Sequence, residues 1–195
     1  ASSIEKVAKD FPKLQFAIVD MVVNQPNVQS VVFKEQEGSF LVGMLAAMAS
    51  KTGKVAFIGG MDIPLIRKFQ CGFEQGVKYS NPKAEVFANM TGTTGAAWSD
   101  PGRGGELAKA QFAKGVDVVF AAAGGTGVGV YQAAKDAGIP VLTWDSDMLP
   151  ENKDLRLAYI GTHNYEIGTN LATLDISRAE RFRDNAASPQ VKLIE

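Results

Sequence analysis

Short runs of apolar residues recur along this chain, and each run ends in small or acidic residues. The strongest runs, rich in β-branched side chains, are residues 55–60, 116–123 and 139–144, and weaker companions lie at 16–19 and 84–87. Nearly continuous apolar runs of this length are typical of strands buried on both faces of a parallel sheet. The pattern therefore predicts a strand at each run.

Segments with helical periodicity separate these runs. One helix is predicted to begin at Asp62 and Pro64, a second opens at Asp100 and Pro101, and a third runs over residues 35–50. The first of them places its apolar side chains on one face: Ile66, Phe69, Phe73 and Val77. Strands and helices thus alternate at the spacing of βαβ units, which predicts an α/β fold with a mostly parallel sheet covered on both faces.

Ligands of such sheets bind at the carboxyl ends of the strands, where loops meet helix N-termini. Several chemically distinctive segments follow the predicted strands: Asp20, the segment 59–62, the loop 91–100, the turn 124–129, and the acidic segment 145–147. We expect a binding site to be assembled from these segments.

The glycine-rich turn Gly124–Gly129 resembles a phosphate-binding loop, because glycines allow close backbone approach and a helix start offers free N–H groups. Its spacing does not fit the dinucleotide pattern G-x-G-x-x-G, since Val130 occupies the last required position, and no G-x-x-x-x-G-K-[ST] motif occurs in the chain. The alternative is a tight turn from strand to helix that approaches an uncharged ligand or simply packs closely.

Three further side chains at the strand ends have a functional and a structural interpretation. Trp98 lies in a loop of Gly, Thr and Ala, where its ring could stack on a flat ligand or cover the edge of the core. Asp20 and Asp145 directly follow apolar strands, so each could accept paired hydrogen bonds from vicinal hydroxyls. Aspartate is also a routine helix N-cap, and the residues alone leave both interpretations open.

Composition and motifs argue against several other functions. The formal net charge is −1 with both signs interspersed, which provides no surface for a nucleic-acid backbone. The single histidine, His163, is interpreted as a solvated loop residue, and the single cysteine, Cys71, as a buried structural thiol. Asp145 and Asp147 could in principle share acid/base work, but their spacing is equally that of a strand-end loop. We expect no catalysis, no metal site and no cofactor.

From Ser3 to Asp147 the order of motifs resembles the basic-membrane-protein family of bacterial substrate-binding lipoproteins, which includes purine-nucleoside receptors of ABC transporters. The matching stretches are residues 33–40, 59–64, 73–79, 91–101, 123–127 and 145–147. The resemblance implies a three-layer Rossmann-like parallel sheet, one lobe of a type I periplasmic binding protein. It also implies a nucleoside or sugar-like ligand, a permease partner, and a periplasmic or membrane-anchored location.

In that family the ligand lies between two lobes, with the base between aromatic rings and the ribose held by acids. Carried over residue by residue, the resemblance assigns stacking to Trp98, a backbone contact to Gly125, ribose binding to Asp145, and an acid at the interlobe strand end to Asp20. The family's opening strand and its first aromatic have no counterpart ahead of Ser3. The late lysine that completes the family's site has none after Asp147.

The resemblance also divides the chain. Residues 1–31 are expected to be a remnant of the first lobe and its crossover, 32–147 the Rossmann-like lobe, and 148–195 a tail similar to LacI-like sugar-binding proteins. We interpret this order as a trimmed or engineered chimera, whose tail could pair two copies into a homodimer. No signal peptide is expected in this chain, and no apolar run reaches the length of a membrane span.

Two other functions compete with a solute receptor. The chain could be an α/β scaffold that retains no ligand binding. It could also be an enzyme of the doubly wound group that uses the glycine-rich turn on a nucleotide, although no nucleophile and base are paired in the sequence.

Overall fold

The computed structural model describes residues 2–161, 166 and 169–170 of the chain. Its contacts divide the chain into two compact units, Ala1–Pro140 and Val141–Glu195, and each unit is described by itself. His163 and most of the tail expected at 148–195 lie outside the described residues. The domain limits expected from the sequence stay predictions.

The first unit contains a three-stranded parallel sheet in the order β4-β3-β5. The central strand β3 (Lys54–Met61) pairs with β4 (Glu85–Gly92) on one side and with β5 (Val118–Ala122) on the other. Its residues from Val55 to Gly60 are all buried, as expected for a strand covered on both faces. The apolar runs therefore located all three strands of this sheet.

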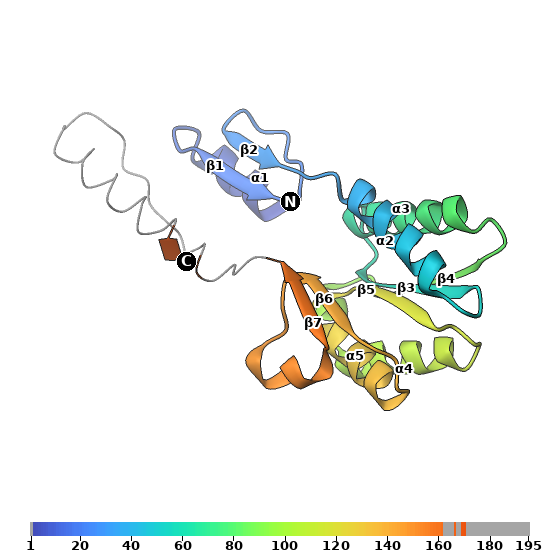
Figure 1. The fold of residues 1–195 in the computed structure, drawn as a ribbon. Helices are drawn as coiled ribbons and strands as arrows, with labels where there is room; N and C mark the ends of the chain where they lie inside the picture. Colours follow the sequence, from blue (N-terminus) through green and yellow to red (C-terminus); the bar gives the residue numbers. More distant parts are fainter. Residues whose placement is uncertain (1, 162–165, 167–168, 171–195) are drawn as a thin grey trace. The chain divides into compact units, whose positions relative to one another are not determined.

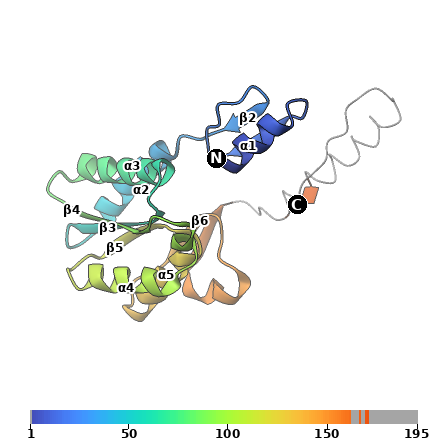
Figure 2. The ribbon, with the colours of Figure 1, turned by 180° about the vertical axis from the view of Figure 1, so that it is seen from behind.

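Helices cover both faces of this sheet (Figure 1; from behind in Figure 2). They are α2 (Glu35–Ala49) and α3 (Pro64–Ser80) on one face, with α4 (Pro101–Phe112) and α5 (Gly127–Asp136) on the other. Phe57 of β3 packs with Phe73 of α3, while Ile58 packs with Ala108 and Val130 of α4 and α5. The three-layer α/β architecture predicted from the sequence is confirmed.

Helices α2 and α3 pack at backbone distance because glycines lie at their contact. A Cβ atom on Gly43 would lie 2.9 Å from the carbonyl carbon of Phe73, and one on Gly76 would lie 2.8 Å from that of Phe40. Cys71 of α3 is exposed, so the expectation of a buried thiol is wrong. Helical geometry explains the error, since the buried side chains of α3 define a different face of the helix.

Asp117 holds the backbone together at the amino ends of the strands, the end of the sheet away from the loops that follow β3 and β5. Its carboxylate accepts hydrogen bonds from Ser50 Oγ at 2.6 Å, Lys51 N at 2.7 Å and Thr52 N at 3.1 Å. Burial by itself would raise the pKa of Asp117, but these hydrogen bonds outweigh it and hold the pKa below its ordinary value. Asp117 thereby ties the end of α2 to the start of β5.

The N-terminal segment forms α1 (Ser2–Asp10) and a separate parallel pair, β1 (Phe16–Val19) and β2 (Val28–Val31). Buried Asn27 organises this segment, because its Nδ2 donates to the carbonyl oxygens of Ala8 at 3.1 Å and Leu14 at 2.9 Å. The sequence predicted β1 but neither α1 nor β2. Strand β2 reads Val-Gln-Ser-Val, which lacks the continuous apolar run that marks a doubly buried strand.

The described part of the second unit is a parallel pair of strands, β6 (Leu142–Asp145) and β7 (Ala158–Gly161). A 3₁₀ segment, η3 (Pro150–Leu155), lies in the connection between them. Strand β6 was predicted and β7 was not. The amide of Leu157 donates to the carbonyl of Val141 at 2.8 Å and aligns the start of the pair.

Candidate functional site

Two short 3₁₀ segments lie at the carboxyl ends of the three-stranded sheet. Segment η1 (Gly95–Trp98) follows β4, and η2 (Gly124–Thr126) follows β5. Trp98 is partly buried and packs against the main core cluster. A Cβ atom on Gly60, near the end of β3, would lie 2.5 Å from Cε3 of the indole, so the ring rests on bare backbone there. Trp98 thus covers the core edge and also keeps part of its surface open to solvent.

Threonine hydroxyls hold the loop that carries Trp98. Thr126 is fully buried, and its Oγ1 donates to the carbonyl oxygen of Ala97 at 2.8 Å and accepts from the amide of Asp100 at 2.8 Å. The hydroxyl of Thr91 donates to the same Ala97 oxygen at 2.9 Å. Reasoning from the sequence missed both threonines, because a Thr among glycines carries no signal of a buried hydrogen-bond bridge.

The glycines of the turn 124–129 serve close packing. Gly124 has φ +54°, and a Cβ on Gly125 would lie 3.0 Å from the carbonyl oxygen of Trp98. A Cβ on Gly129 would lie 2.7 Å from the carbonyl carbon of Pro101, so α5 needs hydrogen at this position to approach α4. Of the alternatives left open by the sequence, close packing accounts for these glycines without a phosphate.

The predicted site residues fall into separate groups. Trp98 and Gly125 are brought together at the carboxyl ends of one sheet. Asp20 directly follows β1 in the other sheet of the first unit, where it is exposed and has φ +64°, a left-handed conformation that aspartate adopts more readily than most residues. Asp145 ends β6 in the second unit, opposite Gly161 in register.

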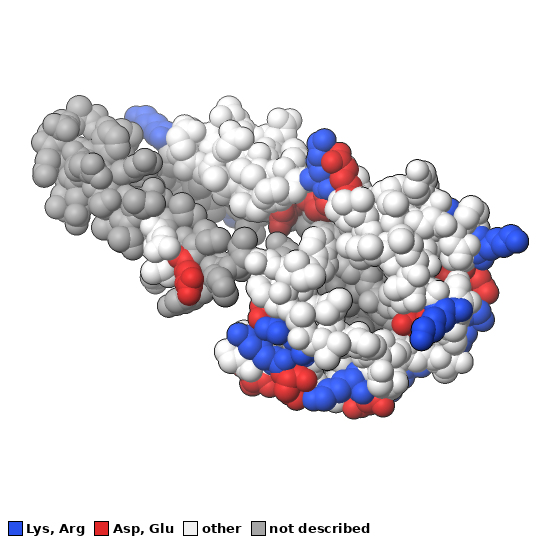
Figure 3. Space-filling view, in the orientation of Figure 1, with Lys and Arg blue, Asp and Glu red and all other residues white. Residues whose placement is uncertain are grey.

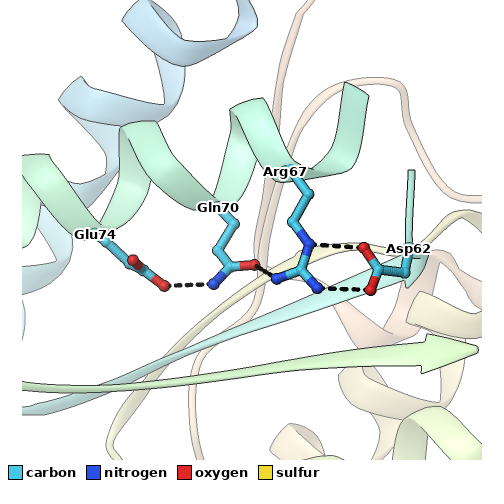
Figure 4. A network of polar contacts seen from close by, with 4 residues as sticks. All are labelled: Asp62, Arg67, Gln70 and Glu74. Carbon is cyan, nitrogen blue, oxygen red and sulfur yellow. Dashed lines mark hydrogen bonds and ion pairs between the residues drawn. The ribbon is translucent and has the colours of Figure 1, made fainter. Parts of the chain in front are cut away.

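Two other aspartates near strand ends are held by arginines. Asp62, next after β3, receives hydrogen bonds from Nε and Nη2 of Arg67, both at 2.6 Å (Figure 4), and these lower its pKa. The network in Figure 4 continues along α3 through Gln70 to Glu74. Asp62 does not serve as the cap of α3, whose N-cap is the next residue along the chain. Its carboxylate is therefore engaged in a surface ion pair.

Asp147 is engaged in the same way in the second unit. Its carboxylate accepts hydrogen bonds from Nε and Nη2 of Arg156, each at 2.6 Å, and from the Thr143 hydroxyl at 3.1 Å. Arg156 holds the pKa of Asp147 far below its ordinary value. A carboxylate in this state does not hold a proton at neutral pH. The structure therefore argues against Asp147 as an acid that would share catalytic work with Asp145.

This ion pair predicts how stability varies with acidity. The pKa of Asp147 is depressed in the folded protein, so the pair stabilises above the unfolded value of about 4 and its effect disappears as pH falls through the folded value. Asp147→Asn should lower the thermal midpoint by the same amount between roughly pH 7 and pH 5, with the difference shrinking only below about pH 4. Circular dichroism melts across this range measure it.

The matched control is Glu151→Gln, which removes an exposed carboxylate from the same connection and should leave the midpoint unchanged at every pH. If the difference in thermal midpoint between the wild type and Asp147→Asn vanishes between roughly pH 7 and pH 5, the assignment of a depressed pKa to Asp147 is contradicted.

A parallel sheet with helices on both faces places this chain in the Rossmann-like α/β class of proteins, in which ligands bind at the carboxyl ends of the strands. Solved structures agree. ABC transporter system solute-binding proteins from Aeropyrum pernix K1 match with TM-score 0.66 and 32% identity, covering 74% of this chain and 43% of that one. The Cra regulator from Pseudomonas putida matches with TM-score 0.62 and 13% identity, covering 100% of this chain and 70% of that one, and shows the fold alone.

The sequence model of the PnrA-like ABC transporter substrate-binding proteins matches residues 1–173, and the chain belongs to this family. The match extends past Asp147, where the motifs recognised in the sequence end. Among curated relatives, the CD4+ T-cell-stimulating antigen of Listeria monocytogenes is 43% identical over 69% of this chain. The ABC transporter nucleoside-binding protein BmpA of Lactococcus lactis is 40% identical over 66%.

The chain spans only part of these relatives, since the matched segments cover 37% of the Listeria protein and 36% of the Lactococcus protein.

Among the described residues, no helix is long and apolar enough to cross a membrane. On the face drawn in Figure 3, acidic and basic side chains of the described residues lie close to one another and do not gather by sign.

Proposed function

We propose that this protein binds a nucleoside, or a similar polar ring compound, without turnover, as an extracytoplasmic solute-binding protein or a lobe of one in ABC-transporter uptake. The observation that carries the proposal is the partly exposed indole of Trp98 at the carboxyl ends of the sheet, resting on Gly60 and beside the 124–129 turn. Membership in a family of substrate-binding proteins supports it. So does the nucleoside-binding relative from Lactococcus lactis.

The residues around the ring favour an uncharged ligand. The segments 91–99 and 123–130, which form the two loops beside Trp98, contain no charged residue. A phosphate group would need a cation or a set of free amides, whereas a base needs only an aromatic face and a few hydrogen-bonding groups. A nucleoside therefore fits these loops better than a nucleotide does.

Within this proposal the predicted residues have distinct roles. Trp98 stacks on the base, and Gly125 offers its backbone to the ligand. Asp145 and Asp20 accept hydrogen bonds from the ribose hydroxyls, which a carboxylate can bind in pairs. Asp20 suits this role because its side chain is exposed and follows the end of a strand.

Titration calorimetry with adenosine, guanosine, inosine, ribose and guanosine monophosphate tests the proposal. We expect saturable binding of at least one nucleoside, and weaker binding of ribose, which lacks a base to stack. Binding of the monophosphate should also be weaker, because the loops offer no cation. If none of these compounds binds, a scaffold that retains no ligand binding is favoured. Release of free base or phosphate during the titration would indicate an enzyme instead.

Replacing Asp145 by Asn should weaken the binding of a ribose-bearing nucleoside roughly tenfold or more, because hydrogen bonds to a charged acceptor are the strong ones. The thermal midpoint should change little, whereas a large drop would show a structural role. A nucleoside without the 2′ and 3′ hydroxyls provides the control. It should bind the variant and the wild type with nearly equal affinity.

Two partners belong to the proposal. The family's transport role implies a permease that receives the ligand-bound protein. A homodimer through the C-terminal tail stays a prediction, and most of that tail lies outside the described residues. Light scattering of the full chain would measure whether one copy or two form the unit in solution.

A further inference from the structure

The backbone of the segment that carries Trp98 is held on both sides of the ring. The carbonyl of Ala97, immediately before Trp98, accepts hydrogen bonds from Thr91 at 2.9 Å and from Thr126 at 2.8 Å. The amide of Asp100, just after the ring, donates to the same Thr126 hydroxyl at 2.8 Å. One fully buried side chain from η2 therefore bridges the two ends of the segment 97–100.

The indole ring of Trp98 lies against the backbone of two glycines, Gly60 and Gly124. A Cβ atom on Gly60 would lie 2.5 Å from Cε3 and 3.0 Å from Cη2 of the indole, which is too close for any side chain. A Cβ on Gly124 would lie 3.4 Å from Cε3. Glycines on β3 and η2 thus allow the ring to lie against backbone, and the hydrogen bonds of Thr126 stop the loop from lifting away.

Thr126 also belongs to the contact between α4 and α5. A Cβ on Gly104 of α4 would lie 3.1 Å from Cγ2 and 3.2 Å from the carbonyl carbon of Thr126. The packing of α4 and α5 therefore fixes the position of Thr126. Its hydroxyl in turn fixes the loop after β4 through the hydrogen bonds to Ala97 and Asp100. The two loops beside the ring are consequently joined to each other through Thr126.

We propose that Thr126 and Gly60 are positioning residues that hold the Trp98 indole in its stacking orientation before any ligand arrives. A ring that is already ordered loses less conformational entropy on binding. Thr126 and Gly60 therefore raise the affinity for the ligand without contacting it. The expected effect of Thr126 and Gly60 on affinity rests on the proposed function. Their expected effect on the order of the Trp98 ring does not depend on any ligand.

The first measurement is made without ligand. The chain has two tryptophans, Trp98 and Trp144, so Trp144→Phe leaves Trp98 as the only indole. In this background, acrylamide quenching of the fluorescence reports how accessible and mobile Trp98 is. Thr126→Val, which preserves shape and removes the hydroxyl, should raise the quenching constant. Thr126→Ser, which keeps the hydroxyl, should restore it.

The second measurement is nucleoside affinity, with Trp144 intact. Thr126→Val should weaken binding about two- to tenfold, the effect of one or two hydrogen bonds, and Thr126→Ser should bind like the wild type. Gly60→Ala should also weaken binding, because its methyl group displaces the ring. The control is Ser50→Ala, which removes the hydrogen bond to Asp117 at the opposite edge of the sheet and should change neither quenching nor affinity.

The outcomes separate the two proposals. Quenching that is unchanged by Thr126→Val, or raised equally by Ser50→Ala, would overturn the positioning role. If quenching responds as expected but the wild type binds no nucleoside, the positioning of the ring stands and the proposed function fails. Should Thr126→Val not fold, Thr91→Val removes the other hydroxyl at the Ala97 carbonyl and takes its place in both measurements.

Discussion

Replacing Trp98 by alanine is expected to weaken nucleoside binding by about 5- to 150-fold, because stacking of a base on an aromatic ring contributes roughly 1–3 kcal/mol. The indole is the only large aromatic ring in the two uncharged loops at the carboxyl ends of the sheet, residues 91–99 and 123–130. Its removal leaves a ligand with small side chains and backbone for contact. Calorimetric titration of the variant against the best nucleoside of the panel measures the loss.

Trp98 also packs on the core, so the alanine variant should melt at a lower temperature than the wild type. The titration is therefore done well below the melting temperature of the variant. Trp98→Phe is the matched comparison, because it keeps an aromatic face and should recover most of the affinity. Equal affinities for the alanine, phenylalanine and wild-type proteins would show that the ring only covers the core.

Gly129→Ala should reduce the free energy of unfolding by about 1–2 kcal/mol net, the largest effect on stability that we expect from a single methyl group. The new Cβ would lie 2.7 Å from the carbonyl carbon of Pro101 and 2.8 Å from the amide nitrogen of Gly105, and both neighbours are backbone atoms. Alanine gains about 1 kcal/mol of helix propensity over glycine, so overpacking outweighs the gain. Denaturant unfolding followed by circular dichroism measures the difference.

Gly95→Ala is the control for this variant. Gly95 lies in η1, and a Cβ there would meet nothing within 4 Å, so its replacement should change stability by no more than about 0.5 kcal/mol. A Gly129→Ala protein as stable as the wild type would contradict the packing explanation of the glycine-rich turn. It would reopen the interpretation of that turn as a loop that approaches a ligand.

The periodicity of the sequence predicted the architecture well where burial is complete. The run at 55–60 became the central strand β3, and the side chains predicted to share a face of α3 are those that meet the sheet. Prediction failed at two of the short strands, β2 and β7, although β1, which has the same burial pattern as β2, was predicted from its apolar run. Strand β2 alternates partly buried and exposed residues over only four positions, and the residues of β7 are mostly exposed.

The candidate site shows the same division. Trp98 and Gly125 could be singled out because an aromatic ring and a glycine turn at strand ends are visible in the sequence. The sequence could not show that Thr126 bridges Ala97 and Asp100, since that bridge joins positions 26 and 29 residues apart. It also could not show that Arg67 and Arg156 occupy two of the strand-end carboxylates, because ion pairs depend on side-chain directions in three dimensions.

By itself, the sequence determined the class of fold, because that follows from the order of strands and helices, and it predicted a ligand site at the carboxyl ends of the strands. Only the tertiary structure decided what the distinctive residues at that edge do. It showed that the glycines of the 124–129 turn let two helices approach, and that the lone cysteine of α3 is exposed. Trp98, which the sequence left between covering the core and facing a ligand, covers the core with its ring against backbone, and it is only partly buried, as the proposed stacking on a ligand requires.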